Sequence, residues 1–182
     1  MVKMIYYQDE DVLIRDMEPA DGLIFTEEEI AQGWHATVEK YEQHLKDRSE
    51  GRCVSLTAEY RGNPAGYINV YNKPVEGPFV SREWPEINDF GVLQKYRRRG
   101  IGAKLMDAAE KIAAGRADTV CLSVGLHNGY GSAQRMYVKR GYIPDGSGAW
   151  YNGKPCTPYD TVYTNDDDLV LYMSKELREA KK

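Results

Sequence analysis

Short apolar runs, rich in β-branched and aromatic residues and bounded by glycine, proline or asparagine, recur along the chain. Runs of this length and composition are typical of β-strands. The strands predicted in this way are residues 12–17, 52–60, 65–71, 86–93, 119–124 and 169–173. A turn-forming sequence at 61–64 separates the second strand from the third, so we expect these two strands to form a hairpin.

Other segments place apolar residues three and four positions apart, which is the period of an α-helix. The predicted helices are residues 26–34, 37–48, 101–114 and 132–140. Gly115 stands where the C-cap of the third helix is expected, whereas Pro19 and Gly22 are expected to stop the first strand. Residues 143–168 are expected to be a loop. Because the sequence has no internal repeat and no change in composition, we predict one α+β domain over residues 1–182.

Composition narrows the class of protein. Of the 182 residues, 42% are hydrophobic and 29% are charged, which is typical of a folded globular protein and not of a disordered one. The formal net charge of −4 argues against a general nucleic-acid-binding protein. No apolar run approaches the ~20 residues of a membrane helix. Three scattered cysteines without metal-ligand spacing favour reduced thiols, so we expect a soluble cytoplasmic protein with no nucleic-acid or membrane partner and no metal.

The segment from 90 to 103 carries the chemistry. An apolar strand is followed by three consecutive arginines, then by Gly100 and Gly102, and then by the predicted helix. The first turn of a helix has unpaired N–H groups and a partial positive charge, so it accepts an anion. Glycine lets a phosphate approach the backbone, and arginine adds forked donors. A diphosphate is the expected guest, although a basic surface turn with glycines for packing is the alternative.

Two motifs resemble the GNAT superfamily of N-acetyltransferases. Residues 97–102 (RRRGIG) fit the [Q/R]xxGxG acyl-CoA signature, and residues 133–142 (AQRMYVKRGY) resemble the later AxxxYxKxGF segment. The resemblance is specific over roughly residues 86 to 142. It implies a mixed, mostly antiparallel central sheet flanked by helices, with splayed middle strands. It also implies that acetyl-CoA is the acyl donor and that an amine is the acceptor.

The resemblance further implies positions for acetyl-CoA. In the family the pyrophosphate lies on the [Q/R]xxGxG turn, and the pantetheine arm pairs with the main chain of the preceding strand, like an added β-strand. A backbone N–H near Phe90 to Val92 would hold the oxyanion. The family's asparagine position is occupied by Tyr130, so Asn128, displaced by two residues, and Ser132 are the substitutes considered. The residues expected at the cofactor are Phe90, Val92, Arg97, Arg98, Arg99, Gly100, Ile101, Gly102, Ala103, Asn128 and Ser132.

Two residues are expected to move protons. Tyr137 matches the tyrosine that protonates the leaving thiolate in the family, and a phenol is protonated at neutral pH. The alternative for Tyr137 is a core side chain. Glu86 stands 11 residues before Arg97, the spacing of the base glutamate in one branch of the family. Asp89 is a second candidate base, on the opposite face of the strand if the alternation is regular. A water remains a third.

The acceptor amine is not named by the sequence. We expect it near the two early helices and the loops around 73–84 and 143–168, and a small amine, an aminoglycoside-like polyamine and a peptide amine all stay open. So does a homodimer. The acidic runs 27–29 and 166–168 are expected to be solvated, and the alternative is that they attract a cationic amine at the rim of the cleft. The candidates for the wall of an acceptor pocket are Tyr151, Tyr159, Tyr163 and Tyr172. The alternatives to an enzyme of this kind are a non-catalytic acyl-CoA-binding sensor or interaction module, and an enzyme that binds another diphosphate nucleotide.

Overall fold

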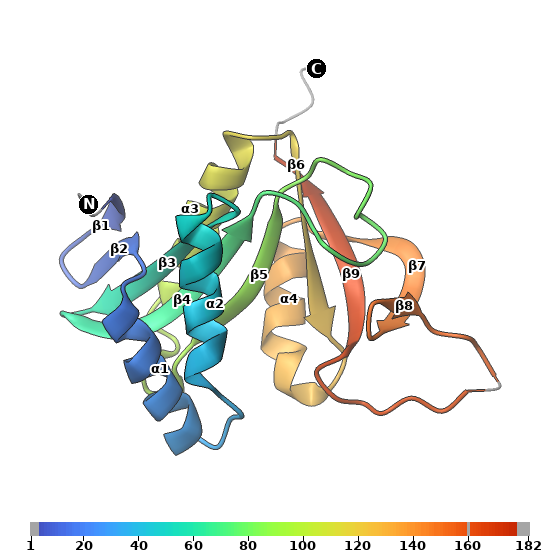
Figure 1. The fold of residues 1–182 in the computed structure, drawn as a ribbon, viewed down its shortest axis with the longest axis horizontal. Coiled ribbons are helices and arrows are strands. Elements are labelled where there is room, and N and C mark those ends of the chain that lie inside the picture. The colour runs from blue at the N-terminus through green and yellow to red at the C-terminus, as the bar shows by residue number, and fades with distance from the viewer. Residues whose placement is uncertain (1–3, 160, 178–182) are drawn as a thin grey trace. The chain divides into compact units, whose positions relative to one another are not determined.

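The computed structural model describes residues 4–159 and 161–177 (Figure 1). The chain packs into two compact units. The first comprises residues 1–71 and 88–112, and the second comprises residues 72–87 and 113–182. Strand β5 (Glu86–Val92) begins in the second unit and ends in the first.

The first unit combines an antiparallel sheet with helices. Strands β1 to β4 pair in sequence order, each antiparallel to the next, and β5 follows β4. Figure 1 shows helices α1 and α2 side by side over this part of the sheet. The elements are β1 (Ile5–Gln8), β2 (Val12–Asp16), α1 (Pro19–Ala31), α2 (Val38–Ser49), β3 (Cys53–Tyr60), β4 (Asn63–Tyr71), η1 (Gln94–Tyr96) and α3 (Ile101–Ala114).

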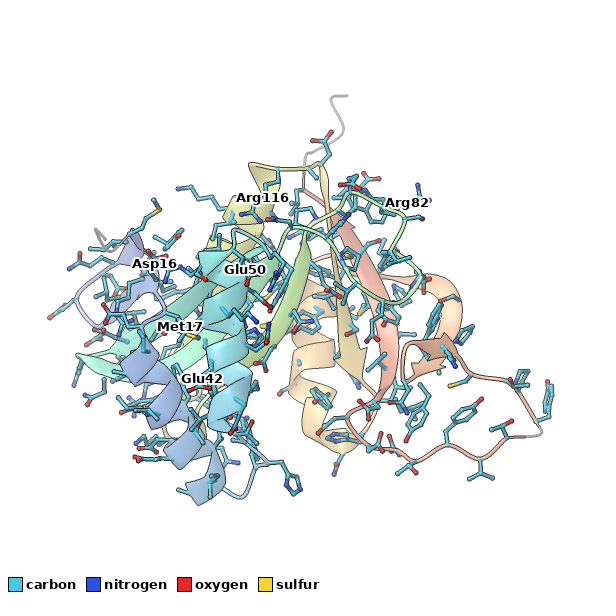
Figure 2. All side chains as sticks on the ribbon, viewed as in Figure 1. Asp16, Met17, Glu42, Glu50, Arg82 and Arg116 are labelled. Atoms are coloured by element: carbon cyan, nitrogen blue, oxygen red, sulfur yellow. The ribbon has the colours of Figure 1, made fainter. Side chains whose placement is uncertain are left out.

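Aromatic side chains form a core between the two early helices and the sheet. Phe25 of α1, Tyr41 of α2 and Tyr67 of β4 lie with ring centroids 5.0 to 5.6 Å apart and are at most 3% exposed. Met17, which lies beside Asp16 at the end of β2 (Figure 2), packs against the same cluster. Each buried ring contributes about 2 kcal/mol through the hydrophobic effect, so this cluster fixes the helices on the sheet.

The second unit has a parallel pair followed by antiparallel strands. β5 pairs with β6 through Glu86–Cys121 and Ile87–Leu122. β9 pairs antiparallel with both β6 and β7, and β8 pairs with β7. The elements are β6 (Thr119–Gly125), η2 (Asn128–Tyr130), α4 (Gly131–Lys139), β7 (Ile143–Tyr151), β8 (Lys154–Pro155) and β9 (Leu169–Glu176). The predicted mixed, mostly antiparallel sheet flanked by helices is confirmed.

Three sequence-based expectations about elements were wrong. Helix α1 begins at Pro19 and not at residue 26, because proline is well tolerated in the first helical turn. Gly22 lies inside that helix, where a Cβ would come within 2.7 Å of Tyr41 Cβ. Strand β1 was not predicted, and the expected loop at 143–168 contains β7 and β8. The strand signal of β7 is weak, since Gly146 and Gly148 adopt positive φ where its pairing with β9 is irregular.

Candidate functional site

The predicted diphosphate turn lies in the first unit, between η1 and α3. Arg98 and Gly100 both adopt left-handed backbone angles, with φ of 61° and 75°. In the described part of the chain, the backbone N–H groups of Arg98 to Ala103 donate no hydrogen bond. The next N–H along the chain, that of Lys104, donates to Gly100 O at 3.1 Å. A turn of this kind, followed by a helix start without acidic residues, gathers N–H donors that suit an anion.

Aromatic rings hold two of the three arginines of the turn. The guanidinium of Arg97 lies 5.2 Å from the ring centroid of Trp34, and that of Arg99 lies 4.9 Å from the ring of Tyr60. Arg97 Nε also donates to Val92 O at 3.2 Å. Arg98 has no described side-chain partner. Arg97 and Arg99 are therefore engaged by their neighbours, whereas Arg98 offers its guanidinium to an anionic ligand.

The structure brings Gly102 against the predicted pantetheine strand. A Cβ on Gly102 would lie 3.3 Å from Phe90 Cζ and 3.6 Å from Val92 Cγ2, so glycine lets α3 start close to β5. Gly91 makes a second close approach, because a Cβ there would meet the Tyr67 hydroxyl at 2.9 Å. Val92 O accepts from Arg97, which was not expected of a group proposed to pair with pantetheine.

In the second unit, Tyr137 lies on α4 with its ring buried. It is 5% exposed, and its ring meets Tyr142 edge-on at 5.6 Å. Its hydroxyl has no hydrogen-bond partner in the described part of the chain, and the hydroxyl oxygen is not completely enclosed by other atoms. Burial raises the pKa of Tyr137 above its ordinary value near 10. The phenol is therefore protonated at neutral pH and able to donate its proton.

Glu86 is also in the second unit, at the start of β5, and is 7% exposed. It pairs in register with Cys121 of β6, whose pKa is raised to about 12 by burial and by the charge of Glu86. Burial and the charges of Glu76, Glu86 and Cys121 likewise raise the pKa of Tyr172 to about 12. Glu86 is thus a buried carboxylate beside an aromatic cluster and not a solvated strand-start residue.

The two candidates for the missing asparagine lie near the start of α4. Asn128 begins η2, next to His127, whose Nε2 is 2.9 Å from Asp167 Oδ1. Ser132 is exposed in the first turn of α4. Helix α4 is attached to the end of β6 by Gln134 Nε2, which donates to Gly125 O at 2.8 Å. No contact in the described residues distinguishes Asn128 from Ser132 as a cofactor ligand.

A polar cluster in the first unit was not predicted as a site. Glu29 of α1 is 1% exposed, although the run 27–29 was expected to be solvated. It accepts from the Tyr67 hydroxyl at 2.5 Å and pairs with Lys40 of α2 at 3.3 Å. Asp89 of β5 adopts a φ of 44°, so the regular alternation assumed for this strand fails. Phe25 and Glu29 are four residues apart and so lie on the same face of α1. Recognition of the start of α1 in the sequence would therefore have predicted that Glu29 is buried with Phe25.

Asp89 also joins a second set of contacts. His44 Nε2 lies 2.9 Å from Asp89 Oδ2, and His44 Nδ1 lies 2.9 Å from the Tyr71 hydroxyl. Tyr71 donates in turn to Asp47 Oδ2 at 2.7 Å. Burial opposes ionisation of Asp89, yet His44 and Lys40 together hold its pKa below the ordinary value. A carboxylate whose ionised form is stabilised by its neighbours is a weak general base, which argues against Asp89 in that role.

No group of three or more potential metal ligands occurs among residues 4–159 and 161–177. None of the helices in that part of the chain is long and apolar enough to cross a membrane.

The mixed, mostly antiparallel sheet, with a basic, glycine-containing turn that joins β5 to α3, agrees with the fold that the resemblance of the two sequence motifs implied. The model of the acetyltransferase (GNAT) family matches residues 17–142. The chain belongs to this family. A comparison with curated protein sequences gives no significant match.

Solved structures of acetyltransferases share the fold. YncA of Salmonella typhimurium, described as an acetyltransferase and solved with its cofactor acetyl-CoA, superposes with a TM-score of 0.67 at 16% identity, over 95% of this chain and 98% of that one. Ard1 of Thermoplasma volcanium gives 0.67 at 19% identity, over 93% and 99%. An acetyltransferase from Salmonella typhimurium that modifies the N-terminal serine of ribosomal protein L7/L12 gives 0.69 at 10%, over 95% and 99%.

Proposed function

We propose that the protein transfers the acetyl group of acetyl-CoA to a primary amine by direct attack in a ternary complex. The nitrogen of the neutral amine forms a bond to the acyl carbon and loses one proton. The carbon–sulfur bond breaks and the departing thiolate gains one proton, so the products are an N-acetylated amine and CoA thiol. The observation that carries the proposal is the turn at 97–103, in which the backbone N–H groups of residues 98–103 make no hydrogen bond in the described part of the chain. Family membership and the acetyl-CoA bound to yncA support it.

Acetyl-CoA would be held by main-chain groups more than by side chains. The pyrophosphate suits the N–H groups of residues 98–103, with Arg98 as the mobile cation. The pantetheine arm would pair with β5 near Phe90, and a backbone N–H there would stabilise the oxyanion. Asn128 and Ser132 are further candidates for cofactor contacts from the second unit.

Tyr137 and Glu86 would complete the proton transfers. Tyr137 is proposed to protonate the departing thiolate, because its hydroxyl is unpaired and its raised pKa keeps the proton on it. Glu86 is proposed to take the proton of the attacking amine, directly or through a water. No covalent acyl-enzyme is required, since the buried Cys121 thiol has a pKa of about 12 and is a poor nucleophile.

Two glycine variants test the turn. Gly100 and Gly51 have φ of 75° and 74°, and a Cβ on either would meet nothing within 4 Å. Alanine at either position therefore carries the same strain, about 1 kcal/mol for a left-handed residue. Gly100→Ala, which adds a methyl group where the pyrophosphate is expected, should weaken acetyl-CoA binding in calorimetry by about tenfold, or ~1.4 kcal/mol. Gly51→Ala should leave the affinity unchanged, and equal losses in both variants would contradict the assignment.

Turnover is tested by release of CoA thiol from acetyl-CoA across a panel of primary amines. Amine-dependent release, with the mass of the acetylated product, is the expected result. Tight acetyl-CoA binding without turnover on any amine would contradict the transfer reaction and favour a CoA-binding sensor. Absence of acetyl-CoA binding, read as no shift in the unfolding temperature, would overturn the proposal altogether.

A further inference from the structure

The ammonium group of Lys40 sits in a cage of acceptors on the α1–α2 side of the first unit. Its Nζ lies 3.0 Å from the Tyr67 hydroxyl, 3.3 Å from Glu29 Oε2 and 3.4 Å from Asp89 Oδ2. The rings of Tyr41 and Tyr67 lie 4.5 and 4.8 Å from the same nitrogen. Three acceptors and two aromatic faces satisfy the three donors and the charge of a primary ammonium.

The cage also contains buried polar atoms that make no hydrogen bond with Lys40. The Tyr41 hydroxyl is fully buried and has no hydrogen-bond partner, although Tyr67 and Glu29 are close enough to affect its pKa, which burial chiefly raises. Asn69 Oδ1, next to Asp89, is also buried without a partner, while its amide donates to Asp89 O at 3.2 Å. Buried polar atoms without partners are rare and call for an explanation, which a polar ligand in the cage would supply.

The cage adjoins the strand along which the acyl donor is expected to lie. Asp89 belongs to β5, and the Tyr67 hydroxyl covers Gly91 of the same strand, where a Cβ would be 2.9 Å away. Lys40 reaches the cage from solvent, because 30% of its side chain is exposed, whereas that of Glu29 is only 2% exposed. The ammonium group of Lys40 can therefore move out of the cage into solvent, whereas the carboxylate of Glu29 stays buried in it.

We propose that Glu29, Tyr67 and Asp89 form an anchor subsite for a second ammonium group of the acceptor, which exchanges with the ammonium of Lys40. This inference rests on the proposed acetyl transfer. Neighbouring carboxylates stabilise the protonated form of an amine, so the amine in the cage is an anchor and not the nucleophile. The acceptor is therefore a molecule with two primary amino groups on a flexible chain, such as an aliphatic diamine or polyamine, or a peptide that presents lysine.

The experiment compares α,ω-diaminoalkanes of three to eight carbons with monoamines of the same length as acceptors. The best diamine should exceed its matched monoamine in kcat/KM by about tenfold or more, mainly through KM. Glu29→Gln should reduce this preference to within about threefold, whereas Glu27→Gln, an exposed change on the same helix, should preserve it. Lysine peptides and diamines are assayed side by side to identify the source of the second ammonium.

Lys40 provides an independent measurement. Lys40→Ala removes the resident ammonium, so Glu29 is left without its cation and the unfolding temperature should fall. Added propylamine, which replaces the deleted atoms, should restore it saturably, and the Glu29→Gln/Lys40→Ala double variant should show no rescue. If Lys40→Ala does not fold, the Glu29→Gln comparison alone decides.

The outcomes separate the two proposals. Equal kcat/KM for diamines and monoamines, with turnover on both, would overturn the anchor subsite and leave the transfer reaction standing. An undiminished diamine preference in Glu29→Gln would also overturn the anchor. No turnover on any amine would overturn the proposed function itself.

Discussion

The role of Tyr137 can be separated from its contribution to the fold. Tyr137→Phe removes only a hydroxyl that makes no hydrogen bond in the described residues, and it keeps a ring that is 5% exposed. Loss of a hydrogen bond usually lowers stability by about 1 kcal/mol, so its absence here predicts a change within about 0.5 kcal/mol. The variant should fold and bind acetyl-CoA like the wild type.

The kinetic effect should be large in comparison. General acids contribute ~10²- to 10⁴-fold, and the lower end applies because a thiolate, with a thiol pKa near 8.5, is already a fair leaving group. We expect kcat to fall about 10²-fold, which corresponds to ~2.7 kcal/mol of transition-state stabilisation. The assay is release of CoA thiol at saturating acetyl-CoA, together with thermal unfolding of the same preparation.

The neighbouring ring supplies the control. Tyr142 is also buried and its ring meets Tyr137 edge-on, so Tyr142→Phe tests whether loss of any hydroxyl in this pair affects turnover. Wild-type kcat in Tyr137→Phe would refute the proton-donor role. A matching loss of kcat in Tyr142→Phe, or a loss of stability in step with activity, would show that the effect is structural.

Two further predictions concern titration. Burial raises the pKa of the Cys53 and Cys121 thiols, whereas Cys156 is partly exposed, so a thiol reagent at pH 8 should react quickly with the native protein at Cys156 alone. Cys156→Ser should abolish the fast reaction. A second fast-reacting thiol would contradict this prediction. Burial opposes ionisation of Asp47, but hydrogen bonds, first among them that from Arg52, lower the pKa of Asp47 in the folded protein below 3.8. The contribution of Asp47 to the stability of the folded protein is therefore complete above pH 3.8 and is lost as the pH falls through the folded pKa. Asp47→Asn should therefore flatten the acid limb of the stability profile in denaturant titrations, and an unchanged limb would refute the assignment.

The fold was predictable where local pattern and tertiary role agree. The turn at 97–103 and helix α3 follow from glycine positions and an apolar period, which need no knowledge of distant contacts. Strand β7 could not be predicted, because its glycines and bulge hide the alternation and β9 supplies its pairing partner. The start of α1 was missed because Pro19 was interpreted only as the end of the preceding strand, whereas it is the first residue of the helix.

The polar cluster lay beyond sequence reasoning for a different reason. A buried glutamate is stabilised only by partners that the fold brings to it, and those of Glu29 come from α2 and β4. In the sequence, Glu29 stands in a run of three glutamates, and such a run is indistinguishable from one whose side chains are all solvated. Asp89 was recognised as a candidate base, but its side chain was assigned to one face of the strand on the assumption that side chains alternate regularly. The positive φ of Asp89 breaks this alternation. Charge pairing over long sequence separations has no local signature.

The stacked arginines of the turn have a thermodynamic consequence. A long side chain loses up to ~2 kcal/mol of rotamer entropy when a ligand immobilises it. Arg97 and Arg99 already rest on the rings of Trp34 and Tyr60, so most of that loss precedes ligand binding, whereas Arg98 would incur it on contact. Binding of a diphosphate should therefore be less unfavourable in entropy than three free arginines would make it, and removing the Trp34 ring should appear in calorimetry as a more negative TΔS.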